Sequence, residues 1–539
     1  MTNDAAFADR NRLWDSLTAG TGADWDVIVI GGGITGAGIL REAARRGYRS
    51  LLIEQRDFCW GTSSRSSKMV HGGLRYLASG KLRLTRDALR ERERLLREAP
   101  GLVERLRYYY PLYRGHFPPR IAAAALFWLY DRLAGVDDRR YLDTPGLGRL
   151  FPDLDTSGLS GAYRYSDAVT DDARLVLRLL HEAVEDGAAV RNYTRATDVT
   201  RVNGRVSGVA VQDRESSQTC EIAAGVVINA TGAWADRLKA RVPENFNIRP
   251  QRGSHLVLDS RGFPAPAAIF LRQPEDGRRV FVYPWEGRTV IGTTDIHHGG
   301  DLDSAASITH EELDYLLRAA RPLYSRRPPD RNDVIATWSG VRPIIGKGPS
   351  SDPSRASREH QVWSEPGLVS CSGGKLTTFL HMARDVMARA AEFLPPGRTS
   401  PDERVIRRLS VAAGDIECAD RGLAQRLLDR YGDAAAEMAA AARPGELDPI
   451  EGSTACLAEL RWSSSCEAVV HLDDLMLRRS RLGLLLPHGG DAVIGSVKPV
   501  VQEVLGWDEE TWRSERQRYR DIIARHYALP PAAAPPPEA

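Results

Sequence analysis

A short apolar strand that runs into a glycine-rich turn constrains the fold of this chain more than any other feature. Residues 27–30 (Val-Ile-Val-Ile) are typical of a buried parallel strand. Three glycines follow in the spacing of a dinucleotide-binding fingerprint: Gly31, Gly33 and Gly36. The first permits a tight turn, the second lets the backbone approach a pyrophosphate, and the third lets the next helix pack closely. The N–H groups at the start of that helix favour phosphate binding.

A second apolar run over residues 48–53 ends in Glu54, about 20 residues past the glycines. An acid at this position accepts a hydrogen bond from a ribose hydroxyl and repels a 2′-phosphate. A glycine-rich turn in an ordinary α/β domain does not explain why an acid ends the second strand. The sequence therefore predicts a dinucleotide-binding βαβ unit over residues 25–57, although the fingerprint alone does not distinguish NAD from FAD.

Further segments carry a resemblance to a known protein family. These segments are residues 59–77, 226–234, 292–295, 339–343 and 372–378. With them, the chain resembles the FAD-dependent glycerol-3-phosphate dehydrogenases from about Asp26 to about Met387, and more weakly through its C-terminal helices. The block 71–76 (His-Gly-Gly-Leu-Arg-Tyr) is the most family-specific part, whereas the turn 229–232 (Asn-Ala-Thr-Gly) occurs in many flavoproteins.

The resemblance implies an α/β fold in which an FAD-binding, Rossmann-like domain is interleaved with an antiparallel-sheet substrate domain. The architecture is glutathione-reductase-like and D-amino-acid-oxidase-like, and a C-terminal helical domain follows. The 539 residues exceed one ordinary core, which agrees with several domains. We expect an N-terminal arm over 1–24, an oxidoreductase region over 25–398, a helical domain over 399–529 and a disordered tail over 530–539. Within 25–398, the FAD-binding parts are about 25–105, 160–245 and 335–398, and the substrate or cap parts are about 106–159 and 246–334.

Two local expectations accompany these boundaries. The polar sequence of residues 1–24 predicts a loose arm, although Trp14 could dock it on the body of the protein. Residues 85–105 have leucines at helical spacing among many charges, which predicts a helix with one solvated face.

Composition excludes several classes of function. The formal net charge is +2 and no block of like charges is long enough to follow a phosphate backbone, so nucleic acid is not an expected partner. Six scattered cysteines have neither zinc-site spacing nor the density of a disulfide scaffold, so we expect no metal and a cytoplasmic location. No apolar run reaches the roughly 20 residues that cross a bilayer. We expect peripheral contact with the inner face of the cell membrane, through apolar and basic surface around residues 118–133.

The resemblance implies that FAD is the cofactor. We expect it to be held non-covalently, because no motif demands attachment to a cysteine or a histidine. The residues expected at the cofactor are Gly31, Gly33, Gly36, Glu54, Thr62, Ser63, Ser64, Lys68, Ala230, Gly232, Gly374, Lys375, Leu376 and Thr377.

The reaction implied by the resemblance is oxidation of sn-glycerol 3-phosphate to dihydroxyacetone phosphate, with hydride transfer from C2 to N5 of the flavin. Arg75 and Arg342 lie in glycine-flanked, otherwise apolar segments, and a guanidinium can bind phosphate oxygens through two donors. We expect Arg75 mainly on the phosphate and Arg342 nearer the C2 oxygen, against the alternative of structural ion pairs. Lys375, at a helix start, adds a cation near flavin and substrate.

Two histidines compete for the role of acceptor of the C2 proton. His71 lies in the family-specific block, and His255 begins a predicted strand. The sequence does not rank them, and His71 could instead contact the flavin. Hydroxyl donors to the phosphate or the glycerol hydroxyls are expected from Tyr76, Thr293 and Thr294.

Several alternatives stay open at this stage. The electrons could pass to a membrane quinone or, in an oxidase, to O2. A flavin-binding electron carrier or scaffold would need no substrate of its own, and the same architecture also hosts amino-acid oxidases. A homodimer is a further open alternative.

Overall fold

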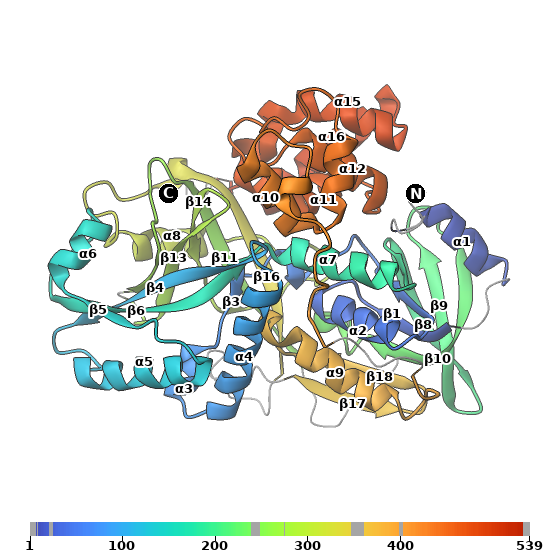
Figure 1. The fold of residues 1–539 in the computed structure, drawn as a ribbon, viewed down its shortest axis with the longest axis horizontal. Helices are drawn as coiled ribbons and strands as arrows, with labels where there is room; N and C mark the ends of the chain where they lie inside the picture. Colours follow the sequence, from blue (N-terminus) through green and yellow to red (C-terminus); the bar gives the residue numbers. More distant parts are fainter. Residues whose placement is uncertain are drawn as a thin grey trace, which may run out of the picture.

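A computed structural model describes residues 7, 9–20, 25–238, 248–273, 275–345, 360–397 and 403–531. Two β-sheets lie side by side, and a helical domain formed by the C-terminal part of the chain covers them from above (Figure 1). The predicted fold class is confirmed. It combines a Rossmann-like sheet, a largely antiparallel second sheet and a C-terminal helical domain.

The first sheet is the predicted nucleotide-binding sheet, with the order β17-β18-β10-β1-β2-β7 and with β8 and β9 attached beside β10. Its strands are β1 (Trp25–Ile30), β2 (Ser50–Ile53), β7 (Ala189–Arg191), β8 (Thr194–Val202), β9 (Arg205–Asp213), β10 (Thr219–Asn229), β17 (Gln361–Glu365) and β18 (Leu368–Ser372). Strand β1 lies between parallel β2 and β10, and its central side chains are fully buried, as the apolar run predicts. On one face α2 (Ile34–Arg45) packs between α7 (Asp172–Glu185) and α9 (Phe379–Ala390).

The second sheet has the order β15-β11-β14-β13-β12-β4-β6-β3, with β16 paired to β11 and β5 to β6. Its strands are β3 (Met69–Val70), β4 (Val103–Tyr113), β5 (Arg140–Leu142), β6 (Leu159–Thr170), β11 (Ile248–Asp259), β12 (Ala268–Arg272), β13 (Arg279–Trp285), β14 (Arg288–Gly292), β15 (Ile296–His297) and β16 (Val334–Ile345). Its helices are α3 (Leu74–Ala78), α4 (Leu82–Glu98), α5 (Arg120–Ala134), α6 (Thr144–Leu150) and α8 (His310–Ala320). Each of these elements connects or covers strands of the second sheet.

The structure corrects two expectations about this region. The sequence places residues 160–245 and 335–398 in the FAD-binding parts. Strands β6 and β16 nevertheless lie in the second sheet, because β6 pairs with β4 and β16 pairs with β11 along its whole length. The helix expected over 85–105 ends at Glu98. Pro100 has no N–H to continue it, and Gly101 has φ +73°, so the chain reverses and enters β4.

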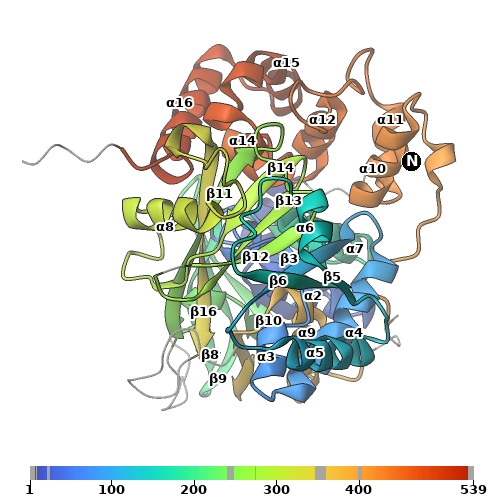
Figure 2. The ribbon, with the colours of Figure 1, turned by 90° about the vertical axis from the view of Figure 1, so that its left-hand side faces the viewer.

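The C-terminal domain consists of helices within its described residues, 403–531. Its helices are α10 (Arg421–Tyr431), α11 (Ala434–Ala440), α12 (Leu457–Cys466), α13 (Leu472–Asp474), α14 (Leu482–Leu485), α15 (Ile494–Leu505) and α16 (Glu509–His526). Figure 2 shows these helices at the top of the molecule, with α3 and α5 at the opposite, lower end. The expected tail beyond residue 531 lies outside the described residues.

The N-terminal arm contains a docked helix, α1 (Arg10–Thr18), which packs beside β10. Trp14 anchors it, since the side chain is 5% exposed and its Nε1 donates to Oε1 of Gln218 at 2.8 Å. The guanidinium of Arg191 lies 4.5 Å from the centre of the same ring. Residues 10–18 are therefore not loose, and of the two sequence-based alternatives the docked one is correct.

We expect Trp14→Ala to release α1 from the sheet, because deletion of a buried tryptophan costs about 3–5 kcal/mol. Limited proteolysis should then cleave the arm at least tenfold faster than in the wild type. Arg12→Ala, at an exposed position of the same helix, is the control and should leave the rate unchanged. Equal cleavage rates for Trp14→Ala and wild type would show that Trp14 does not hold the arm.

Candidate active site

A cavity of about 740 Å³ lies between the two sheets. Its floor is formed by the turns that follow the carboxyl ends of β1, β10 and β18, where parallel α/β sheets bind ligands. Its other end is formed by β4, β6, β12 and β13 of the second sheet. The volume lies within the roughly 300–1,000 Å³ that is usual for ligand sites.

The fingerprint glycines form the turn at one end of this cavity. Gly31 has φ +114°, and a Cβ there would lie 2.7 Å from the carbonyl oxygen of Ala230. A Cβ on Gly36 would lie 1.9 Å from the carbonyl oxygen of Gly31, so only glycine allows α2 to pack this closely on β1. Gly33 lines the cavity, and a Cβ there would meet only the Ser63 hydroxyl, at 3.0 Å. The turn is therefore shaped for close approach of a ligand backbone such as a pyrophosphate.

Two polar side chains fix the shape of this turn. Glu54 accepts from the N–H of Gly32 at 2.7 Å and from the N–H of Arg56 at 2.9 Å, and it lines the cavity. Burial raises the pKa of Glu54, and the two N–H groups oppose this by stabilising the carboxylate. Ser63 Oγ accepts from the N–H of Ile34 at 2.9 Å, in the first turn of α2.

A buried carboxylate, that of Asp167, holds the family-specific block and also lines the cavity. The N–H of Gly72 lies 3.1 Å from Oδ1 of Asp167 and 3.1 Å from the hydroxyl of Tyr130. Arg92 pairs with the same carboxylate oxygen at 2.7 Å. Burial raises the pKa of Asp167, while Arg92 counteracts this increase. Asp167 lies within β6 and no motif in the sequence marks it, so sequence reasoning missed it.

Three predicted substrate residues come from this block and from the turn before α9. Arg75, Tyr76 and Lys375 all line the cavity. The ammonium of Lys375 lies 4.1 Å from the centre of the Tyr76 ring. Arg75 is exposed at the cavity mouth, and among the described residues its guanidinium has no ion-pair partner, so a ligand anion can reach it.

Arg342 reaches the same cavity from β16. It donates to Oγ1 of Thr293 at 3.2 Å, and its guanidinium lies 3.7 Å from Oδ1 of Asp295. All three residues line the cavity. The structure thus brings Arg75, Lys375 and Arg342 to one cavity from three separate segments of the chain.

The two candidate histidines have different environments. His71 lines the cavity, and its backbone N–H donates to Oγ1 of Thr377 at 3.0 Å. His255 is fully buried behind Ser67, whose cavity-lining hydroxyl is 2.8 Å from the His255 Nε2. The His255 ring stacks on Trp338 at 4.8 Å. Burial, with the nearby Arg342 and Lys68 cations, lowers the pKa of His255 well below its usual value.

Five predicted site residues do not line the cavity: Gly36, Ser64, Lys68, His255 and Thr294. Lys68 is fully buried, with its ammonium 2.9 Å from Oδ1 of Asp172 and 2.6 Å from the carbonyl oxygen of Ser64. Burial lowers the pKa of Lys68 to about 8. Ser64 is buried, at 4% exposed, and Thr294 donates to Oε1 of Glu312 at 2.6 Å. Their neighbours in sequence face the cavity, and spacing alone did not show which side chains point inward.

Sequence reasoning also missed an aromatic wall. The side chains that form it come from the second sheet: Tyr108, Tyr110, Tyr165, Phe270 and Phe281. The run 108–110 (Tyr-Tyr-Tyr) is the sequence signal for this wall. It closely follows the helix predicted over 85–105, which hid its place in a strand. The remaining predicted cofactor residues do line the cavity: Thr62, Ser63, Ala230, Gly232, Gly374, Leu376 and Thr377.

Comparison with known proteins agrees with this geometry. Residues 26–387 match the family model "FAD dependent oxidoreductase", and residues 396–512 match "C-terminal domain of alpha-glycerophosphate oxidase". The chain is 37% identical to glycerol-3-phosphate dehydrogenase 2 of Mycobacterium bovis, over 93% of this chain and 88% of that protein. It is 32% identical to the aerobic glycerol-3-phosphate dehydrogenase of Staphylococcus aureus (strain USA300), over 85% and 86%. The chain belongs to the FAD-dependent glycerol-3-phosphate dehydrogenase family.

A solved structure of this family supports the same assignment. The glycerol-3-phosphate dehydrogenase from Bacillus halodurans, complexed with FAD, superposes with a TM-score of 0.75 at 27% identity, over 96% of this chain and 97% of that one. The cofactor of the family is FAD, and the residues present here fit it. The glycine turn would hold the pyrophosphate, and Glu54 would hold the ribose. Non-covalent attachment stays a prediction.

The glycine contacts predict two different defects. Gly36→Ala should destabilise the protein even without FAD, by about 3 kcal/mol or more, because its Cβ meets rigid backbone. Gly33→Ala should lower the melting temperature of the apoprotein far less than Gly36→Ala and should weaken FAD binding, because Gly33 lines the cavity and its Cβ would meet only the Ser63 side chain. Apoprotein melting and FAD titration separate the two effects. A Gly36→Ala apoprotein that melts like the wild type would contradict the packing argument.

Proposed function

We propose that this protein oxidises sn-glycerol 3-phosphate to dihydroxyacetone phosphate and passes the electrons to a membrane quinone. The observation that carries the proposal is the convergence of Arg75, Arg342 and Lys375 on the cavity beside the dinucleotide turn. A phosphate carries up to two negative charges, and guanidinium and ammonium groups are the side chains that bind it most strongly. The names of the most similar relatives agree with this substrate.

Each cation has a separate task in the proposed reaction. Arg75, exposed at the cavity mouth, binds the phosphate, and Lys375 adds a second positive charge over Tyr76. Arg342, oriented by Thr293 and Asp295, lies against the C2 oxygen and stabilises the negative charge that develops there. FAD, when bound, accepts the hydride that leaves C2.

We assign the acceptance of the C2 proton to His71. Its position in the cavity supports this choice, and Thr377 fixes its backbone. His255 could take the proton only through the Ser67 hydroxyl, and its lowered pKa opposes the charged form. His71 is therefore the better candidate, with His255 as the alternative.

Removal of either arginine should impair the reaction in a distinct way. Loss of one partner of a charge-assisted pair costs about 2–5 kcal/mol. At about 1.4 kcal/mol per tenfold, kcat/KM should fall by about 30- to several-thousand-fold. Arg75→Ala should lose discrimination between glycerol 3-phosphate and glycerol, because the lost energy belongs to the phosphate. Arg342→Ala should lower kcat more than it raises KM.

Anaerobic bleaching of the flavin by glycerol 3-phosphate measures both effects. Arg261→Ala, at a side chain that is 88% exposed, is the matched control and should bleach like the wild type. Wild-type bleaching in Arg75→Ala or Arg342→Ala would make that arginine structural. Bleaching by amino acids instead of glycerol 3-phosphate would favour an amino-acid oxidase, and no bleaching by any substrate would favour an electron carrier. Hydrogen peroxide formed in proportion to turnover would favour an oxidase that uses O2.

An apolar stripe supports the membrane part of the proposal. Phe117, Ile121 and Trp128 are 86%, 85% and 49% exposed, and the last two lie on α5. Leu82, at the start of the neighbouring α4, is 51% exposed. Helix α5 lies at the end of the molecule opposite the C-terminal domain (Figure 2). No helix in the described part of the chain is long and apolar enough to cross a membrane. We infer peripheral contact of α5 with the inner face of the cell membrane.

Ile121→Asp should weaken binding to vesicles of phosphatidylethanolamine and phosphatidylglycerol at least tenfold, because it places a charge in the apolar stripe. Co-sedimentation measures the bound fraction. Ala440→Asp, the same change in charge on α11 of the C-terminal domain, is the control. Equal binding by Ile121→Asp and wild type would exclude α5 as the contact.

A further inference from the structure

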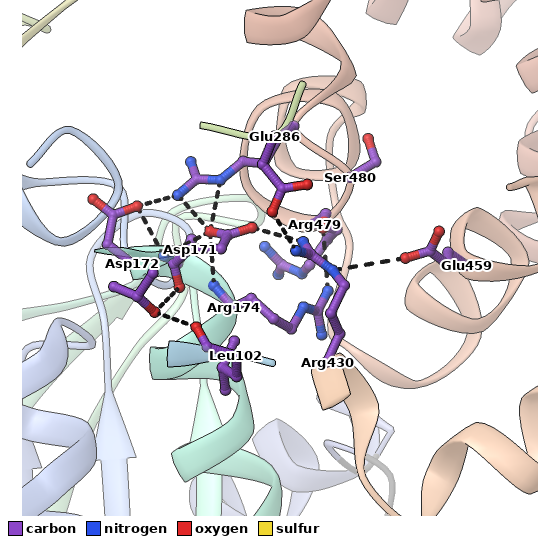
Figure 3. Close-up of polar contacts among 12 residues, drawn as sticks. Leu102, Asp171, Asp172, Arg174, Glu286, Arg430, Glu459, Arg479 and Ser480 are labelled. Atoms are coloured by element: carbon purple, nitrogen blue, oxygen red, sulfur yellow. Dashed lines mark hydrogen bonds and ion pairs between the residues drawn. The ribbon is translucent and has the colours of Figure 1, made fainter. Parts of the chain in front are cut away.

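Three buried arginines of the C-terminal domain reach the back of the cofactor cavity. Arg478, Arg479 and Arg481 are each at most 1% exposed and lie between α13 and α14. Figure 3 shows Arg430 of the same domain beside Asp171, which precedes α7, and the two side chains pair at 2.7 Å. These contacts join the helical domain to the body of the protein.

Arg481 makes the contacts nearest to the cavity. Its Nε donates to Oδ1 of Asp171 at 2.9 Å, and its guanidinium also pairs with Asp172. A further N–H of the same guanidinium donates to the carbonyl oxygen of Ser64 at 3.3 Å. Burial alone would raise the pKa of Asp171, but Arg481 and Arg430 hold it well below its usual value. Arg481 thus binds two carboxylates and the backbone of one loop at once.

That loop, called the serine loop (residues 62–67), forms one wall of the cavity. Asp172 accepts from the N–H of Ser66 at 3.0 Å and from its hydroxyl at 2.6 Å. Lys68 pairs with the same carboxylate and also donates to the carbonyl of Ser64. The contacts of Asp172, Lys68 and Arg481 therefore fix the backbone of residues 64–68. The residues of this loop that line the cavity are Thr62, Ser63, Arg65, Ser66 and Ser67.

The neighbouring turn is held in the same way. Asp57, three residues after Glu54, accepts from Arg479 at 2.7 and 2.8 Å and pairs with Arg478. Burial alone would raise the pKa of Asp57, but the two guanidiniums lower it. The C-terminal domain therefore holds both the turn beside Glu54 and the serine loop, from the side that faces away from the cavity.

We propose that Arg481 is a positioning residue for the cofactor. Through it, the C-terminal domain sets the affinity of the cavity for FAD. Arg481 does not line the cavity, and it acts by holding the loop 62–67 in the shape that faces the ligand. Removal of its charge leaves Asp171 and Asp172 with fewer partners, and the loop relaxes. The inference concerns the cofactor alone and does not depend on which substrate the enzyme oxidises.

The test is a titration of full-length apoprotein with FAD, followed by quenching of flavin fluorescence. Arg481→Met, which has a similar length but no charge, should raise the Kd for FAD at least tenfold. Arg481→Lys, which keeps the charge, should lie between Arg481→Met and wild type. The control is Arg461→Met, because Arg461 pairs with Glu446 and Glu503 inside the C-terminal domain. It should leave the Kd unchanged.

The visible circular dichroism of the flavin, at saturating FAD, separates positioning from general loss of stability. Arg481→Met should alter this spectrum, whereas a residue that only stabilises the fold would leave the bound flavin unchanged. A wild-type Kd and spectrum in Arg481→Met would overturn the proposal, as would an equal rise of Kd in Arg461→Met.

A milder variant tests the same idea if Arg481→Met does not fold. Tyr527, after α16, accepts from Nε of Arg65 at 3.0 Å, and Arg65 lies in the same loop. Tyr527→Phe removes only this hydroxyl and should raise the Kd about threefold with a changed flavin spectrum. A wild-type Kd and spectrum in Tyr527→Phe would count against control of the loop by the C-terminal domain.

Discussion

Arg481 places a full positive charge where its side chain is only 1% exposed, so the folded protein requires carboxylates that face it across the domain contact. Asp171 and Asp172 supply the opposing negative charge from the start of α7. Asp172 also holds the serine loop. Loss of one member of such a cluster is costly, because it leaves an uncompensated buried charge. The helical domain therefore contacts the surroundings of the cavity, although none of its residues within 403–531 lines it.

The cavity combines two kinds of surface that come from the two sheets. The first sheet contributes backbone N–H groups and glycines, which suit a phosphate-containing cofactor. The second sheet contributes Arg342, Thr293 and an aromatic wall, which suit a small anion placed beside a planar ring. The chemistry depends on the join between the sheets, since the glycine turn follows β1 of the first sheet and Arg342 comes from β16 of the second.

Sequence reasoning worked best where the physical constraint is local. The tight turn at Gly31 and the close packing at Gly36 follow from spacing along one strand and one helix. It failed for Lys68 and Thr294, because whether a side chain faces a cavity depends on strands that pair across long distances in the chain. His255 is another case, since its place behind Ser67 results from the pairing of β11 with β14 and β16.

The amino-acid sequence by itself determined the dinucleotide turn, the acid at the end of β2 and the family to which the chain belongs. It did so because glycine spacing and strand length act within about 30 residues. Only the tertiary structure decided which candidates share the cavity, that Asp167 anchors the block 71–76, and that Arg481 binds the backbone of Ser64 beside the cavity. The burial and pairing of a charge depend on residues hundreds of positions away, such as Asp172 and Arg481, and no local pattern records that distance.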